Sequence, residues 1–136
     1  MVNGKGPCMA WQFSSEHAET ALTSRDDFVA ALRQQAGGLV DEFVAKMIYT
    51  EAVANVIRHA PGAILIVLET DADAHWLSVF DEGPPFDWEP TLPSNPYVEG
   101  GRGLFLIDRY ADSVVVERLR VGGNVVRIKF RLAASV

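Results

Sequence analysis

Cysteine is nearly absent from the sequence, with Cys8 the only one among 136 residues. A lone cysteine cannot form an intramolecular disulfide or a cysteine-built metal site, and it favours a reducing compartment. Long hydrophobic runs are absent too. No segment reaches the roughly 18 consecutive apolar residues of a membrane span, and residues 1–7 lack the apolar run of a signal peptide. We therefore expect a cytoplasmic protein that does not cross a membrane.

Basic residues are in the minority. The sequence has 12 Lys and Arg against 18 Asp and Glu, so the formal net charge is −6 with His neutral. Proteins that bind nucleic acid through its phosphates carry basic patches, and this charge balance therefore argues against direct binding to nucleic acid. The balance is compatible with a small phosphorylated ligand held by backbone amides.

Length and composition are those of one globular domain. Of the residues, 49% are hydrophobic and 22% are charged, which is typical of a globular chain. A chain of 136 residues falls within the range of about 100–200 residues for one domain. We therefore expect residues 1–136 to form a single domain with its core over about 9–132.

A short strand and a helix are expected at the start of the chain. Trp11 and Phe13 alternate with polar residues, as in a half-buried strand. Ser24 and Asp27 have the spacing of a capping box, which predicts that the first helix begins there. A pair of glycines at 37–38 would end this helix.

A longer helix and two hairpins are expected after these elements. The second and longest helix covers 41–60 and ends at a Pro-Gly pair. The elements expected after it are strands over 64–68 and 76–80, a proline-rich loop over 83–101, a helix over 102–111, and strands over 114–119 and 126–132. Strands grouped in hairpins favour helices on one face of the sheet. The predicted fold class is α+β, a two-layer sandwich with a mixed, mostly antiparallel sheet.

Three polar residues form a stripe on the second predicted helix. Glu51, Asn55 and His59 are spaced four residues apart, so they lie about one turn apart on one face. A carboxylate and an amide in this arrangement can hold a hard cation such as Mg²⁺, which prefers oxygen ligands, and can orient a hydroxyl or a water. The alternative is that the stripe is the solvated face of an amphipathic helix.

Asp81 is a second candidate, because it follows a predicted strand and precedes Glu82 and Gly83. Its carboxylate can accept a hydrogen bond from the exocyclic amine of a buried base, and Gly83 would leave room for a ring near the backbone. The alternative is a plain turn, since Asp, Gly and Pro all favour turns.

The third candidate is the glycine-rich start of the helix predicted over 102–111. Gly100, Gly101 and Gly103 flank Arg102 at a point where free backbone N–H groups and the helix dipole favour a phosphate. Arg102 would add a fixed cation beside it. The alternative is a flexible entry to the helix, because the segment is neither a Walker A sequence nor a GxGxxG fingerprint after a strand.

Taken in order, these three segments resemble the motifs of a known family. The run EAVANVIRHA at 51–60 resembles the N-box of the GHKL ATP-binding superfamily, which includes histidine-kinase, gyrase and mismatch-repair ATPase domains. DEGPPFD at 81–87 resembles its G1 box and GRGLFLI at 101–107 its G2 box, while GGNV at 122–125 is similar to the entry into its last strands. Within the superfamily, the chain most resembles the bacterial anti-sigma factor serine kinases, and the resemblance spans 11–132.

This resemblance implies a histidine-kinase-like (Bergerat) ATPase fold whose long loop is an ATP lid, with ATP and Mg²⁺ as cofactors. It assigns Asn55 to Mg²⁺, Asp81 to the adenine amino group, and Glu51 to the general base that deprotonates a serine of a partner protein. Arg102 would balance charge on the transferred phosphoryl group. The other residues that the resemblance places at the ATP are His59, Gly83, Phe86, Gly101, Gly103, Leu104 and Asn124.

The implied function is that of an ATP-dependent serine/threonine protein kinase that regulates transcription. In the family that it resembles, the phosphorylated partner is an anti-anti-sigma factor of the STAS fold, and the kinase dimer also sequesters a sigma factor. A homodimer is therefore expected here from the resemblance. An exposed sheet edge near Trp11 is a plausible place for it.

Two positions differ from the family's usual residues. Pro85 stands where the family usually has Gly, and a proline removes an amide and fixes φ. Asn124 stands near a position where related proteins often have Thr. These differences favour an alternative function, that of a GHKL-fold module that binds a partner, with or without nucleotide, and catalyses no reaction.

Overall fold

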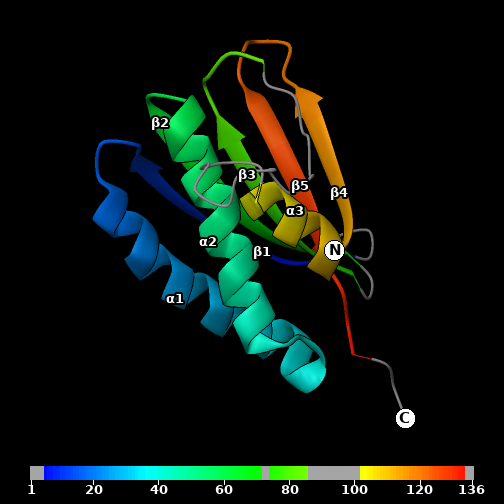
Figure 1. Ribbon diagram of the computed structural model, residues 1–136. Helices are drawn as coiled ribbons and strands as arrows, with labels where there is room; N and C mark the ends of the chain where they lie inside the picture. The colour runs from blue at the N-terminus through cyan, green and yellow to red at the C-terminus, as the bar shows by residue number, and fades with distance from the viewer. Residues whose placement is uncertain (1–4, 72–73, 86–101, 134–136) are drawn as a thin grey trace.

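The computed structural model describes residues 5–71, 74–85 and 102–133, which form a sheet and a layer of helices (Figure 1). The strands are β1 (Lys5–Ser14), β2 (Ala63–Asp71), β3 (Ala74–Asp81), β4 (Ala111–Arg118) and β5 (Asn124–Phe130). The helices are α1 (Ala18–Ala36), α2 (Glu42–His59), α3 (Arg102–Tyr110) and the short 3-10 helix η1 (Gly37–Leu39).

The strands of the described residues form one sheet in the order β1-β2-β3-β5-β4. Each neighbouring pair is antiparallel. In Figure 1, α1, α2 and α3 all lie in front of this sheet, so the helices in the described ranges cover one face. The expected α+β sandwich with helices on one face is therefore confirmed, and every described pairing in its sheet is antiparallel.

The core lies between the sheet and the helices. Successive side chains of a strand point to opposite faces, and in β2 this alternation buries Ile66 and Leu68 completely against the helices. From α1, Phe28 enters the same layer. Its ring centroid lies 5.7 Å from that of Trp11 in β1 and 5.3 Å from that of Tyr49 in α2. This aromatic cluster joins α1 to both the sheet and its neighbouring helix.

The second predicted helix agrees closely with α2 in its bounds, but it is not the longest helix, because α1 has 19 residues and α2 has 18. Asp41 is its N-cap, and its side chain accepts a hydrogen bond from the backbone N–H of Val44 at 3.0 Å. The helix ends at His59, with Ala60 as C-cap before the Pro-Gly pair. It lies between α1 and α3 in Figure 1, so it is central to the helical layer. No helix in the described ranges is both long enough and apolar enough to cross a membrane.

The predicted start of the first helix is wrong. α1 begins at Ala18, and Ser24 lies inside it with 6% of its surface exposed. The residues before Ser24 include several that favour a helix, and Ala21 is buried in the core, so packing extends the helix towards the N-terminus. A serine and an aspartate three residues apart also fit within a helix, where their spacing makes no cap.

Strands β1, β2, β3 and β4 are longer than predicted, whereas β5 covers Asn124–Phe130 and so begins and ends before the predicted 126–132. β1 has 10 residues rather than a short segment around Trp11. β4 begins at Ala111, directly after the last residue of α3, and β5 begins at Asn124. Pairing with both β3 and β4 holds Asn124 in a strand that its own propensity disfavours. Of the loop predicted over 83–101, residues 86–101 lie outside the described residues.

Two leucines of β2 test the assignment of the sheet faces. Leu68 is fully buried against the helices, so Leu68→Ala should lower the free energy of unfolding by about 2–5 kcal/mol. Leu65 points to the opposite face and is half-buried, so Leu65→Ala should cost about 1 kcal/mol. Urea unfolding measures both values. Equal losses from the two variants would contradict the assignment.

Candidate functional site

Asn55 is the most buried member of the polar stripe on α2. Only 2% of its surface is exposed, whereas Glu51 is half-buried and His59, the last residue of the helix, is exposed. The side-chain oxygen Oδ1 of Asn55 is buried, and no described residue donates a hydrogen bond to it. A buried acceptor without a donor is costly. The stripe is therefore not simply the solvated face of an amphipathic helix.

The first turn of α3 packs against α2 beside Glu51. Gly103, the second residue of α3, is buried, and a Cβ added there would overlap the carboxylate oxygen Oε2 of Glu51. Glycine at this position therefore lets the two helices approach closely. The first N–H groups of a helix have no intrahelical acceptor and favour an anion. The arrangement brings the carboxylate of Glu51 beside the first turn of α3.

Asp81, at the end of β3, is also buried, with 4% of its surface exposed. Its oxygen Oδ1 accepts two hydrogen bonds, one from the backbone N–H of Gly83 at 2.8 Å and one from Nδ2 of Asn124 at 3.0 Å. The bond from Gly83 is the local turn that Asp and Gly favour. In the hydrogen bonds of the described residues, the other oxygen, Oδ2, takes no part. Asp81 therefore makes a turn through Oδ1, and within the described ranges Oδ2 accepts no hydrogen bond.

Two close backbone approaches join the ends of β3, β5 and α2. A Cβ at Gly83 would lie 2.6 Å from the Cβ of Ala60, the C-cap of α2. Gly123 has φ of 92°, and a Cβ there would overlap the backbone carbonyl oxygen of Asp81. Figure 1 shows the end of β3, the turn between β4 and β5 and the end of α2 gathered at the top of the view. The glycines allow these three elements to meet.

The predicted site residues fall into two groups within the described part of the chain. Glu51 and Gly103 lie together where α2 meets α3. Asp81, Gly83 and Asn124 lie together at the end of the sheet, where Nδ2 of Asn124 also donates to the carbonyl oxygen of Pro84 at 2.9 Å. Both groups lie along α2, since Gly83 packs on its C-cap and Gly103 on its middle.

The other predicted site residues are Leu104, which the structure describes, and a set that lies wholly or partly outside the described residues. Leu104 is buried, with 7% of its surface exposed, and it follows Gly103 in α3. Phe86, Gly100 and Gly101 lie outside the described residues, and so does the side chain of Arg102, whose backbone begins α3.

Arg118 is a residue at this site that the sequence analysis missed. Its Nη1 donates to the carbonyl oxygen of Gly83 at 2.6 Å and to Oδ1 of Asn124 at 3.4 Å. The sequence does contain a signal that could have predicted this contact. The Gly-Gly pair at 122–123 marks a hairpin turn, and residues that flank such a turn face each other across the two strands. The register of that hairpin pairs Arg118 with Asn124.

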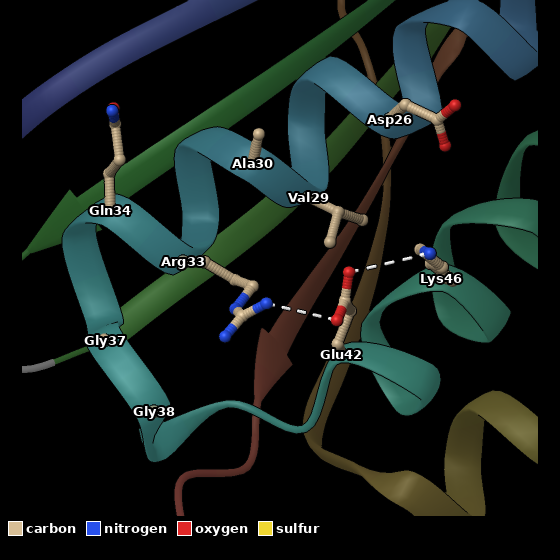
Figure 2. A pocket seen from close by; sticks show the side chains of 9 residues that line it. All are labelled: Asp26, Val29, Ala30, Arg33, Gln34, Gly37, Gly38, Glu42 and Lys46. Atoms are coloured by element: carbon tan, nitrogen blue, oxygen red, sulfur yellow. Dashed lines mark hydrogen bonds and ion pairs between the residues drawn. The ribbon is translucent and has the colours of Figure 1, made fainter.

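A separate cavity of about 580 Å³ lies between the second half of α1 and the start of α2 (Figure 2). Figure 2 shows Arg33 and Lys46 on either side of Glu42, which pairs with them at 3.1 Å and 3.5 Å. These side chains are about half exposed, and exposed ion pairs contribute little to stability. None of the predicted site residues lines this cavity. The candidate site therefore lies away from this cavity, along the second half of α2, where the first turn of α3 and the end of β3 pack against it.

A protein-family profile, serine-protein kinases of staphylococci and a solved structure are all similar to this chain. The family profile of the histidine kinase-like ATPase domain matches residues 13–130. The serine-protein kinase RsbW of Staphylococcus aureus (strain JH9) is 30% identical, over 77% of this chain and 81% of the relative, and RsbW of Staphylococcus epidermidis gives the same values. The solved structure of the Acinetobacter baumannii histidine kinase AdeS matches with a TM-score of 0.53 and 17% identity, and it covers 93% of this chain and 68% of that chain. This last likeness supports the fold alone.

Two glycine substitutions test the packing at the site. In Gly83→Ala, the new Cβ would lie 2.6 Å from the Cβ of Ala60, and neither atom can move without its backbone. The free energy of unfolding should therefore fall by about 1–3 kcal/mol. In Gly103→Ala, the Cβ meets the side chain of Glu51, which can rotate away, and alanine favours a helix, so this variant should be as stable as the wild type. Urea unfolding compares them, and equal losses would show that Glu51 is held rigidly.

Proposed function

The chain belongs to the family of histidine kinase-like ATPase domains, and we propose that it is an ATP-dependent protein serine/threonine kinase of the anti-sigma factor type. Relatives named serine-protein kinases, 30% identical to this chain, support a kinase activity. In this proposal, residues 1–136 act as one ATP-binding domain. The observation that carries it is the buried oxygen of Asn55, which lacks a donor among the described residues and lies one helical turn from Glu51.

Asp81 is the proposed partner of the adenine amino group. An ionised carboxylate only accepts hydrogen bonds, and Oδ1 of Asp81 already accepts two, from Gly83 and Asn124. Oδ2 is then the oxygen that accepts from the exocyclic amine of adenine. Guanine carries a carbonyl at the same ring position, which is itself an acceptor, so the carboxylate would select adenine.

Asn55 is the proposed protein ligand of Mg²⁺. Its buried, donor-free Oδ1 is an oxygen of the kind that Mg²⁺ prefers, so this residue fits the ion. No described residues form a group of three or more His, Cys, Asp and Glu side chains that could hold a metal. Mg²⁺ commonly takes its other ligands from substrate phosphates and water. When bound, the ion would neutralise charge that develops on the β- and γ-phosphates.

Glu51 is the proposed general base. In the reaction, Glu51 takes the proton from a serine or threonine hydroxyl of the partner, the hydroxyl oxygen bonds to the γ-phosphorus, and the bond from that phosphorus to ADP breaks. The closeness of Glu51 to Gly103 supports this role, because it puts the carboxylate beside the helix terminus that would face the phosphates. Positioning and charge stabilisation supply most of the remaining acceleration.

The phosphates are proposed to lie at the start of α3. Gly101 and Gly103 would leave the backbone N–H groups accessible there, and Arg102 would balance charge on the transferred group. The loop before α3 is the proposed ATP lid. The remaining proposed contacts to the nucleotide come from His59, Phe86, Leu104 and Asn124.

The proposed partner is an anti-anti-sigma factor of the STAS fold, and a sigma factor is a possible second one. These partners and a homodimer rest on the resemblance of the sequence to the anti-sigma factor kinases, and the proposed cytoplasmic location rests on the scarcity of cysteine. No direct contact with nucleic acid is proposed, since the formal net charge is −6. A chain with this function would regulate transcription through its protein partners.

Substituting Glu51 tests the catalytic role. Glu51→Gln keeps the size of the side chain but cannot accept the proton, so phosphoryl transfer to a co-purified STAS-domain partner should fall by about 10²–10⁴-fold while Mg-ATP still binds. Glu42→Gln is the matched control, because Glu42 also lies on α2 but pairs with Arg33 and Lys46 away from the site. Transfer is measured with γ-labelled ATP, and binding by calorimetry.

The same measurements separate the kinase from the alternative module. A wild-type protein that binds its partner but transfers no phosphate would support the module that catalyses no reaction. Equal transfer by Glu51→Gln and the wild type would instead reject the role of Glu51 and leave the kinase activity in place.

Removing Mg²⁺ tests the role of Asn55. Chelation of the metal should weaken ATP binding to the wild type by at least about tenfold, because an acidic chain must neutralise the phosphates locally. In Asn55→Ala, chelation should have little further effect, because the proposed protein ligand is already gone. Calorimetry with and without the metal measures this, and thermal unfolding checks that the variant folds. A full Mg²⁺ dependence in Asn55→Ala would contradict the assignment.

A further inference from the structure

Three polar side chains form a row across neighbouring strands at the end of the sheet. Asp81 of β3 stands opposite Asn124 of β5, and Asn124 stands opposite Arg118 of β4. Directly opposed residues of antiparallel strands share a face of the sheet, so all three side chains lie on the same side. A carboxylate, an amide and a guanidinium therefore follow one another from β3 to the edge strand.

The chemistry of this row fixes the orientation of the central amide. Arginine only donates hydrogen bonds, so the atom of Asn124 that faces Arg118 at 3.4 Å must be the oxygen Oδ1. An ionised carboxylate only accepts, so the atom that faces Asp81 at 3.0 Å must be Nδ2. Arg118 and Asp81 thus favour the same orientation of the amide, from its two ends.

Asn124 and Arg118 also hold the turn that follows β3. Pro84 and Pro85 have no backbone N–H, so the turn lacks two donors of its own. Nδ2 of Asn124 donates to the carbonyl of Pro84 at 2.9 Å, and Arg118 donates to the carbonyl of Gly83 at 2.6 Å. Side-chain donors from β4 and β5 therefore bind the carbonyl groups of a turn whose prolines cannot donate.

We propose that Arg118 is a positioning residue for the nucleotide base: through Asn124 and the carbonyl of Gly83, it orients the Asp81 carboxylate that accepts the base amino group. This proposal rests on the proposed binding of an adenine nucleotide. It also links the two departures from the family, because Asn124 and Arg118 hold the turn that contains Pro85. Arg118 touches no reacting atom in this arrangement and acts only through its neighbours.

The exposure of Arg118 distinguishes the proposed positioning role from a role in the stability of the fold. Arg118 is an exposed side chain at the end of the edge strand, whereas Asp81 and Asn124 are buried, with 4% and 3% of their surfaces exposed. Interactions of exposed charged side chains contribute little to the free energy of unfolding. Loss of Arg118 should therefore leave the fold intact and change the geometry of the carboxylate.

The test compares two nucleotides on the full chain. Purine riboside triphosphate lacks only the 6-amino group of ATP, so the ratio of the two affinities reports the bond to Asp81. In Arg118→Ala, affinity for Mg-ATP should fall by about tenfold, while affinity for the analogue should change less than about twofold. A tenfold loss is the size expected when the hydrogen bond between the base amino group and the Asp81 carboxylate is weakened. Arg120→Ala is the matched control, because Arg120 is also exposed and its loss changes the net charge equally.

Arg118→Lys keeps the charge and one donor group, and it should restore part of the preference for ATP. Calorimetry gives the affinities, and thermal unfolding of each variant confirms the fold. An unchanged ratio in Arg118→Ala, or equal losses in Arg118→Ala and Arg120→Ala, would overturn the role of Arg118 while the proposed function stands. A wild-type protein that binds neither nucleotide would overturn the proposed function and this role together.

Discussion

The antiparallel pairing of β3 with β5 is the interaction on which the candidate site depends. It puts Asp81 opposite Asn124, and the positive φ of Gly123 lets the turn after β4 approach the backbone of Asp81. A shift of this register by one residue would turn Asp81 to the other face of the sheet, away from the helices. The buried core of alternating apolar side chains opposes such a shift, so the hydrophobic pattern of the strands also holds the polar site in place.

The helical layer contributes the other half of the site through close contacts made at glycines. Gly103 brings the first turn of α3 against Glu51, and Gly83 brings the end of β3 against Ala60. Both contacts are made to α2, the helix that also carries the buried Asn55. α2 therefore sets the spacing between the place proposed for the phosphates and the place proposed for the base, and the end of β3 packs against its C-cap.

Local signals predicted much of the fold, and long-range packing accounts for what they missed. The helical spacing from residue 41 and the Pro-Gly pair predicted the bounds of α2 to within one residue, whereas α1 begins before its apparent cap because Ala21 packs into the core. The motif resemblance pointed to Asp81 and Asn55, but the burial of Asn55 depends on the packing of α2. Arg118 has no local signal beyond its hairpin, because its contacts to Gly83 require β3, β5 and β4 to be neighbours.

The direct passage from α3 into β4 joins the two parts of the candidate site. Tyr110 ends the helix and Ala111 begins the strand, so no connecting loop separates Gly103 at one end of this stretch from Arg118 at the other. The residue beside the place proposed for the phosphates and the residue beside the place proposed for the base therefore lie on one continuous piece of chain, with no loop between the helix and the strand.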